Sequence, residues 1–385
     1  MNERRLLDQL HREGPASRAD LAKVTGLSKP TVSAALAGLA EDGLVHLVGE
    51  VSGRPGPITS LYDVNAASAH VAGIDIGHDW IRVAVADLRG AFAGRTDGRN
   101  TARTSAELGE LVGELARAAA REAELDWSAI TCAVVGSPGV YDPGAGRLDF
   151  APNLPGPDLA DRLRAALAVD LVIENDINLA AVGEHVYGEG RGKSNFALVS
   201  IGTGVGMGIV VNGELYVGAR GAAGEVSYLP ATDDSAQQAA GGSGPRPADA
   251  DMREHGATET VAAAPGVVRA AQAAGLSLGT AKEIFAAAER GDAAALSVVT
   301  AEGRRIGGLL VAVAAVLDPE VIVLTGGVGH NLDLLGTALE TRIAELGPLR
   351  PTIVASALGD SGVLLGAVAH AQARAWDLIF TARMA

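Results

Sequence analysis

One pattern, an apolar strand followed by a short glycine loop and a second strand, occurs twice in this chain of 385 residues. The first copy spans residues 71–87, and the second spans residues 197–211 and ends at the hairpin turn Asn212-Gly213. Because a strand and not a helix follows each glycine loop, neither copy is the dinucleotide-binding fingerprint of a Rossmann fold. The duplication predicts two related α/β lobes whose glycine loops face one cleft.

The composition is typical of a globular chain with a large core, since 48% of the residues are hydrophobic and 20% are charged. No run of 18 apolar residues and no signal-like N-terminus occurs, so we expect a cytoplasmic protein with no membrane partner. Cys132 is the single cysteine and lies in an apolar run, which favours a buried, inert thiol and excludes a disulfide within the chain.

Residues 17–44, ahead of the duplicated region, have the pattern of two helices separated by a tight glycine turn. Ser17 and Asp20 have the spacing of a capping box at the start of the first helix, in which Leu21 and Val24 are expected to be buried. These features predict a helix-turn-helix, so DNA is the first partner to consider.

The second helix is predicted to begin at Ser28, with Pro30 in its first turn, where a missing N–H does no harm. Its exposed N-terminal end carries short polar and basic side chains that can reach base edges and phosphates. The side chains expected to contact DNA from this helix are Ser28, Lys29, Thr31 and Ser33.

Two further strands are predicted at residues 44–48 and 58–62, joined by a turn at residues 52–57. This hairpin is the wing of a winged helix, and Arg54 at its tip is placed to enter a narrow minor groove. The alternative is a small helical adaptor with a solvated hairpin.

The net charge of −15 lies almost wholly outside the predicted DNA-binding region, because residues 1–64 hold seven Lys or Arg against eight Asp or Glu. An acidic body repels DNA beyond the contact patch and makes the affinity sensitive to salt. We therefore expect weak non-specific binding to DNA.

A polar cluster, Asn175-Asp176, follows a predicted strand that lies between the two copies of the repeat. Ligands of open α/β sheets bind outside the carboxyl ends of strands, so this cluster is placed to recognise hydroxyl groups, with Asp176 as a general base. A helix N-cap is the alternative role for Asp176. The loop Gly202-Thr203-Gly204 can contact a phosphate or form a plain hairpin, whereas His78 and Asp79 make the first loop a poor phosphate site.

Taken together, these motifs resemble the ROK family of repressors, open reading frames and kinases over nearly the whole chain. Gly53-Arg54-Pro55 resembles the repressor branch, residues 75–77 the first phosphate loop, and residues 174–178 the sugar-binding and catalytic motif. Residues 202–204 and the pair Gly224-Glu225 resemble the second phosphate loop and a sugar-binding segment.

The resemblance implies an N-terminal winged helix-turn-helix followed by a two-lobed, actin-like (ribonuclease H-like) domain of the sugar-kinase type. Its implied boundaries are residues 1–64 for DNA binding, 70–176 with 364–385 for the first lobe, and 177–363 for the second. Residues 231–247 are rich in Ala, Gly, Ser, Gln, Asp and Pro, and this composition predicts a mobile surface loop. The implied sugar-binding residues are Asn153, Asn175, Asp176, Glu225 and Glu259. The nucleotide-loop remnants are Asp75, Gly77, Gly202, Thr203 and Gly204.

Two departures from the family pattern bear on activity. The first phosphate loop carries His78-Asp79-Trp80 where family kinases carry Gly-Thr-Lys or a similar sequence. Tyr228 replaces the zinc-binding histidine, and no cysteine lies nearby, so tetrahedral zinc cannot be assembled. We therefore expect no metal, no cofactor and no enzyme beyond residual sugar kinase activity.

The leading hypothesis is a sugar-responsive transcription factor, a repressor of carbohydrate-use genes whose DNA binding is modulated by a sugar or sugar phosphate. It would act as a homodimer or a higher homo-oligomer on a pseudo-palindromic operator. The alternatives are an ATP-dependent, glucokinase-like sugar kinase that retains a DNA-binding domain, in which Asp176 would be the base, and a nucleoid or scaffold protein without an effector.

Overall fold

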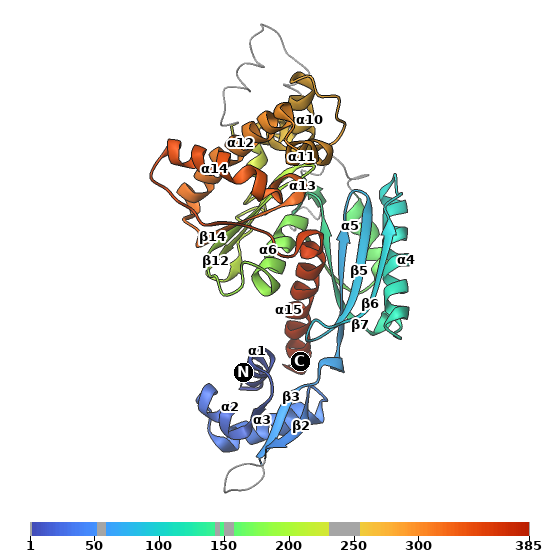
Figure 1. Ribbon diagram of the computed structural model, residues 1–385. Helices are drawn as coiled ribbons and strands as arrows, with labels where there is room; N and C mark the ends of the chain where they lie inside the picture. Colours follow the sequence, from blue (N-terminus) through green and yellow to red (C-terminus); the bar gives the residue numbers. More distant parts are fainter. Residues whose placement is uncertain (1, 52–58, 143–146, 150–157, 231–254, 385) are drawn as a thin grey trace.

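The computed structural model describes residues 2–51, 59–142, 147–149, 158–230 and 255–384. A small N-terminal domain is attached to a larger body of two lobes, and the two ends of the chain lie close together (Figure 1). Within the described ranges no helix combines the length and the apolarity that crossing a bilayer requires.

The N-terminal domain has the predicted winged helix-turn-helix. Ser17 and Asp20 form the capping box, and Gly26 ends the first helix of the motif with φ of 70°. The prediction for Val24 was wrong: its side chain is 60% exposed, because Leu21 and Thr25, one helical turn apart, form the buried face. The elements are α1 (Asn2–Glu13), β1 (Ala16–Ser17), α2 (Arg18–Thr25), α3 (Lys29–Glu41), β2 (Val45–Val51) and β3 (Thr59–Val64).

The wing is an antiparallel pair of strands, β2 and β3, and β1 adds a third strand on the other side of β3. The predicted wing tip, including Arg54, lies outside the described residues.

The two lobes have the same strand order, which confirms the duplication predicted from the sequence. The first sheet has the order β10-β7-β4-β5-β6, and the second has the order β15-β14-β11-β12-β13 when it is listed in the corresponding direction. In each sheet the predicted hairpin, β4-β5 or β11-β12, is antiparallel, and the strands on its other side are parallel. Asn212 and Gly213 both have positive φ, 55° and 78°, as a type I′ turn requires.

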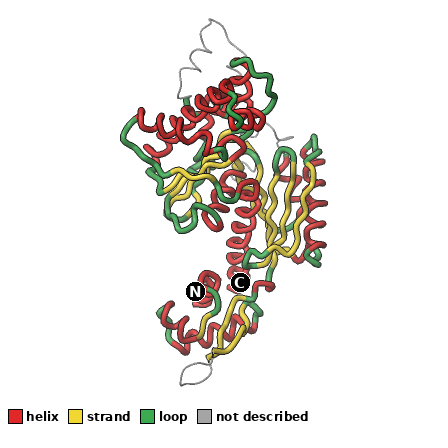
Figure 2. Tube along the Cα trace, in the orientation of Figure 1, coloured by secondary structure: helices red, strands yellow, loops and turns green. Residues whose placement is uncertain are grey.

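Helices cover both faces of the first sheet. Helices α4 and α5 pack on one face through Leu108, Val112 and Leu163, and α15 packs on the other through Leu364 and Val368 (Figure 2). The elements are β4 (His70–Ile76), β5 (Trp80–Asp87), β6 (Phe92–Arg99), α4 (Ser105–Glu122), β7 (Ile130–Ser137), β8 (Val140–Asp142), β9 (Arg147–Asp149), α5 (Leu159–Leu167), β10 (Asp170–Asn175) and α15 (Gly362–Met384), with 3-10 helices η1 (Ala66–Ser68) and η2 (Trp127–Ala129).

The second sheet is also covered on both faces, by α10, α11, α12 and α14 on one side and by α6 on the other. The elements are α6 (Asp176–Tyr187), β11 (Phe196–Ile201), β12 (Val205–Val211), β13 (Glu214–Leu215), α9 (Ala257–Ala262), α10 (Ala264–Ala273), α11 (Ala281–Glu289), α12 (Ala293–Leu317), β14 (Val321–Thr325), α13 (Gly326–Gly329), α14 (Leu332–Leu346) and β15 (Ile353–Ala355), with 3-10 helices η3 (Val226–Tyr228) and η4 (Gly359–Ser361). The loop predicted at residues 231–247 lies outside the described residues.

The last helix, α15, returns to the first lobe as predicted and also packs against the N-terminal domain. One hydrophobic cluster runs from Leu6 and Leu10 of α1 through Trp376 and Phe380 of α15 to Val71 of β4. The winged helix domain and the first lobe therefore share a continuous core.

Candidate functional site

Four carboxylates, one from each of four segments of the two lobes, lie near one another. Asp75 lies near the carboxyl end of β4, and Asp176 begins α6 directly after β10. Because β4, β7 and β10 are parallel, their carboxyl ends lie at one edge of the first sheet. Glu225 and Glu259 come from the second lobe. We call Asp75, Asp176, Glu225 and Glu259 the acidic site.

These carboxylates lie close enough to raise one another's pKa values. Burial, and then the charges of Asp75 and Glu225, raise the pKa of Asp176 to about 6, although the backbone N–H of Ile177 donates to its carboxylate. Burial and then the charge of Glu259 raise the pKa of Glu225. Asp176 thus lies deep in the protein, with part of its side chain open to solvent.

Glu225 is held in place by the glycine before it. Gly224 has φ of 94°, and a Cβ at this position would lie 1.9 Å from the backbone oxygen of Met207 in β12. The backbone N–H of Met207 donates to Gly224 at 3.1 Å, and the N–H of Val226 donates to the same oxygen at 2.7 Å. A glycine at position 224 is therefore needed for the chain to pass against β12 before it turns into η3.

Asn175 already has partners within the chain. Its side-chain oxygen caps α6 by accepting from the N–H groups of Ile177, at 2.9 Å, and Asn178, at 3.1 Å, and its Nδ2 donates to Gly139 at 3.1 Å. The cap of α6 is thus Asn175, and Asp176 adds a second acceptor for the N–H of Ile177 at 2.8 Å. Sugar binding by Asn175 remains a prediction, and Asn153 lies outside the described residues.

An arginine that the sequence reasoning missed pairs with Asp75. Nη1 of Arg82 lies 2.9 Å from Oδ2 of Asp75, and the two side chains are 22% and 7% exposed. Burial raises the pKa of Asp75, and Arg82 opposes that rise. The register of the β4-β5 hairpin could have predicted this pair, because it places Arg82 directly opposite Asp75.

The second glycine loop contacts Glu259, which the family resemblance had assigned to sugar. Oε2 of Glu259 accepts from the backbone N–H of Val205 at 2.8 Å, and the N–H of Gly202 donates to Gly204 at 2.9 Å. A Cβ at Gly204 would lie 2.8 Å from Oε2 of Glu259, so this glycine lets the carboxylate approach the loop. Thr203 is exposed at the tip.

Several polar groups of the two glycine loops already have partners within the chain. The Asp75 carboxylate forms an ion pair with the guanidinium of Arg82. The backbone N–H of Val205, at the end of the second loop, donates to the carboxylate of Glu259. In the first loop the N–H of Gly77 donates to Trp80 at 2.9 Å, and Nδ2 of Asn100 donates to Gly77 at 2.9 Å. Among the described residues, no three His, Cys, Asp or Glu side chains are arranged to hold a metal ion.

The N-terminal end of α3, which the sequence predicts to contact DNA, is largely exposed. Ser28, Lys29 and Ser33 are exposed, and Thr31 is half-buried. The Ser28 hydroxyl caps α3 by accepting from the N–H of Thr31 at 3.3 Å, and the two hydroxyl groups lie 2.7 Å apart. Lys29 and Ser33 are thus the two predicted DNA contacts that take no part in capping α3.

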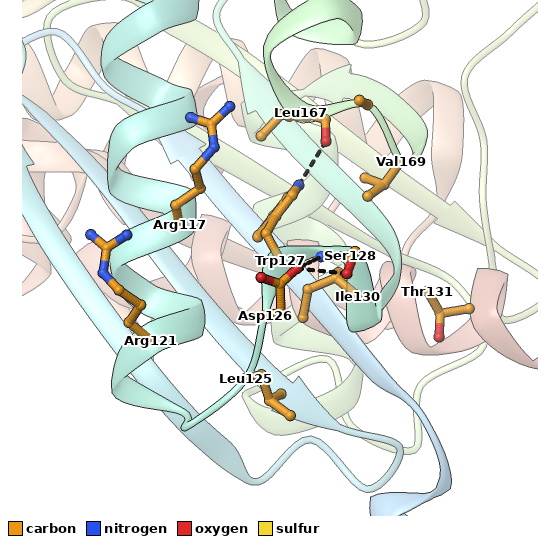
Figure 3. A pocket seen from close by; sticks show the side chains of 11 residues that line it. Arg117, Arg121, Leu125, Asp126, Trp127, Ser128, Ile130, Thr131, Leu167 and Val169 are labelled. Atoms are coloured by element: carbon orange, nitrogen blue, oxygen red, sulfur yellow. Dashed lines mark hydrogen bonds between the residues drawn. The ribbon is translucent and has the colours of Figure 1, made fainter.

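A separate hollow lies at the opposite edge of the first sheet, where β7 begins (Figure 3). Arg117 and Arg121 of α4 line it beside Trp127, whose indole N–H donates to the backbone oxygen of Leu167 at 2.6 Å. Ile130 and Thr131 mark the amino end of β7 in its wall. This hollow is therefore at the far end of the strands from the acidic site.

The fold and the acidic site define a two-lobed protein of the sugar-kinase type that carries a winged helix-turn-helix. The ROK family model matches residues 71–374, and the MarR family model matches residues 1–54. The chain belongs to the ROK family, and its N-terminal region is a MarR-type winged helix domain. These matches confirm the predicted actin-like fold of the two lobes.

Relatives include both enzymes and regulators. The chain is 35% identical over 217 residues to a glucokinase of Halalkalibacterium halodurans, covering 52% of this chain and 62% of that protein. It is 28% identical over 233 residues to the xylose repressor of Bacillus subtilis, covering 60% of each chain. The chain thus spans about three fifths of the length of these two relatives.

Solved structures agree on the fold. A ROK family transcriptional regulator, described as a homolog of the E. coli MLC protein, superposes with a TM-score of 0.79 and 21% identity, covering 98% of this chain and 96% of that one. A ROK family glucokinase of Streptomyces griseus, in complex with glucose and AMPPNP, has a TM-score of 0.64 and 24% identity, and covers 79% of this chain and 100% of its own.

Proposed function

We propose that the chain is a sugar-responsive transcriptional regulator, a repressor of carbohydrate-use genes that a sugar or sugar phosphate at the acidic site releases from DNA. The observation that carries this proposal is the shared core of the winged helix domain and the first lobe, because a DNA-binding domain fixed to a ligand-binding lobe can respond to it. The likeness to a protein named as a xylose repressor supports the same function.

Helix α6 links the acidic site to both lobes. It begins at Asp176 and packs on β12 of the second lobe, where a Cβ at Gly208 would lie 2.6 Å from the Cβ of Ala181. On its other side a Cβ at Gly366 of α15 would lie 1.7 Å from the backbone oxygen of Leu179. A ligand that draws Glu225 toward Asp176 would therefore move the second lobe relative to the first lobe and α15.

Helix α15 then connects α6 to the winged helix domain. Near its C-terminal end, Asp377 pairs with Arg4 at 2.6 Å and Arg383 pairs with Glu3 at 3.1 Å. Trp376 meets the ring of His11 edge-on, with 5.9 Å between the ring centroids. The winged helix domain thus moves with the first lobe, and we propose that a homodimer converts this movement into a changed spacing of two recognition helices.

The test of DNA binding is footprinting of the purified protein on DNA from upstream of its own gene. The proposal predicts a protected pseudo-palindrome whose half-sites lie about one helical turn, or a multiple of it, apart. Lys29→Ala should weaken binding, because it removes a positive charge from the exposed end of α3. Arg290→Ala removes an equal charge from an exposed position in the second lobe and should have no effect. A single unpaired half-site would refute the dimer, and equal losses in the two variants would refute the recognition helix.

A second candidate is a sugar kinase, and the raised pKa of Asp176 favours it because a general base with a pKa near 6 can deprotonate a sugar hydroxyl. The contacts of Asp75 with Arg82 and of Glu259 with Val205 count against it. Sugar-dependent release of ADP that Asp176→Asn abolishes would support the kinase.

A further inference from the structure

A tight turn of the first lobe, residues 87–91, contacts both the winged helix domain and the end of α6. It joins β5 to β6, and we call it the β5-β6 turn. The carboxylate of Asp87 holds it closed by accepting from the N–H groups of Arg89, at 2.8 Å, and Ala91, at 3.0 Å. The N–H of Gly90 donates to the backbone oxygen of Asp87 at 3.0 Å. A turn closed in this way moves as one unit.

On one side, the β5-β6 turn holds the winged helix domain. The guanidinium of Arg89 pairs with Asp63 of β3, and the two side chains are 31% and 15% exposed. Nη2 of Arg89 also donates to the backbone oxygen of Leu10, in the last turn of α1, at 3.3 Å. This position is favourable for a cation, because the last carbonyl groups of a helix carry a partial negative charge. One arginine of the first lobe therefore holds both a wing strand and α1.

On the other side, the turn meets Tyr187, the last residue of α6. A Cβ at Gly90 would lie 2.8 Å from the Tyr187 hydroxyl oxygen and 3.2 Å from Nε2 of Gln372 in α15. Nε2 of Gln372 donates to the backbone oxygen of Asp87 at 3.4 Å, and the Tyr187 hydroxyl donates to Oε1 of Gln372 at 3.5 Å. The end of α6 and the side of α15 thus both touch the turn that holds the winged helix domain.

Helix α6 spans the distance from the acidic site to this turn. It begins at Asp176, in the acidic site, and ends at Tyr187. Between these ends it packs on β12 of the second lobe, close to Gly208. A helix is a stiff element, so a displacement of its first turn also displaces its last. A movement of the second lobe at the acidic site therefore changes the position of Tyr187 against the β5-β6 turn.

We propose that the β5-β6 turn couples the acidic site to the winged helix domain, with Tyr187 delivering the movement and Arg89 passing it to Asp63 and Leu10. This inference rests on the proposed function and deepens it. In the proposed function the winged helix domain moves as one body with the first lobe, whereas this coupling also shifts β3 and α1 relative to that lobe. Tyr187 and Arg89 are positioning residues, because neither belongs to the acidic site.

The test compares the sugar response of DNA binding in Arg89→Ala and in the wild type. Fluorescence anisotropy on DNA from upstream of the protein's own gene, at fixed salt, gives the affinity with and without each member of a panel of hexoses, pentoses and their phosphates. Arg89→Ala should make the sugar-induced change in affinity at least about twofold smaller. Arg162→Ala breaks an ion pair with Asp158 elsewhere in the first lobe and should respond as the wild type does.

Isothermal titration separates coupling from sugar binding. The sugar that acts on the wild type should bind Arg89→Ala with unchanged affinity in the absence of DNA. The physical reason is distance, because Asp87 pairs with His70 at the start of β4, at the opposite edge of the sheet from the acidic site. Tyr187→Ala should weaken the response as Arg89→Ala does, whereas Tyr216→Ala, at another exposed tyrosine of the second lobe, should not.

The outcomes separate this inference from the proposed function. Responses in Arg89→Ala and Tyr187→Ala equal to that of the wild type overturn the inference and leave a sugar-responsive regulator standing. Weaker sugar binding in Arg89→Ala also overturns it, since the lost response would then come from a damaged site. If Arg89→Ala does not fold, Tyr187→Ala decides the matter, because it keeps the pair of Arg89 with Asp63. If no sugar of the panel changes the wild-type affinity, the proposed function fails and the inference fails with it.

Discussion

Asp176→Asn is expected to make the protein more stable and to abolish its response to the effector. The folded-state pKa of Asp176 is about 6 against an ordinary value of 3.8, a rise of roughly two units. At about 1.4 kcal/mol per unit, keeping this carboxylate ionised at neutral pH costs at most about 3 kcal/mol. Because part of the side chain is open to solvent, we expect a gain of about 1–3 kcal/mol in the variant.

The pH dependence of this stability difference tests whether the ionised Asp176 carboxylate causes it. The folded state binds the Asp176 proton more tightly than the unfolded state does, so the destabilisation is absent below about pH 4 and complete above about pH 6. Asn can still accept from the N–H of Ile177. Thermal unfolding should therefore show a melting temperature several degrees higher for the variant at pH 7.5, and no difference at pH 4. An equal difference at both pH values, or a less stable variant at pH 7.5, would refute the reasoning.

Two further predictions concern the last helix. Gly366→Ala should lower the free energy of unfolding by about 1–3 kcal/mol, because its Cβ would lie 1.7 Å from the backbone oxygen of Leu179. Gly336→Ala, on α14 with no atom within 4 Å of the new Cβ, should be neutral or stabilising by chemical denaturation. Arg383→Ala removes the ion pairs with Glu3 and Asp42, so hydrogen exchange in α1 should quicken while exchange in α12 stays unchanged. Unchanged exchange in α1 would contradict the role given to this arginine.

Local sequence signals predicted the elements and the duplication well. The capping box at Ser17, the turn at Gly26 and the hairpin turn at Asn212-Gly213 each depend on a few neighbouring residues, and all three are present. Val24 shows the limit of such reasoning, because a short helix with few apolar residues does not specify which face its neighbours will cover.

The partners of the site residues could not be predicted from local patterns. Strand register places Arg82 opposite Asp75, where the two side chains form an ion pair. Glu259 accepts a hydrogen bond from the N–H of Val205, which is 54 positions away in the sequence. The contact between α1 and α15 joins the two ends of the chain through Arg4 and Asp377, which only the tertiary fold brings together. These contacts set the surroundings of the acidic site and hold the winged helix domain on the first lobe.

The central claim is that a sugar at the acidic site changes the affinity for DNA. The most direct test is fluorescence anisotropy of the protein on a labelled operator fragment, at fixed salt, with and without the sugar that binds. The account predicts an affinity for DNA that falls about 5- to 150-fold in the wild type, the range typical of coupled sites, and does not change in Asp176→Asn. An affinity that the sugar leaves unchanged in the wild type, or lowers equally in Asp176→Asn, would contradict it.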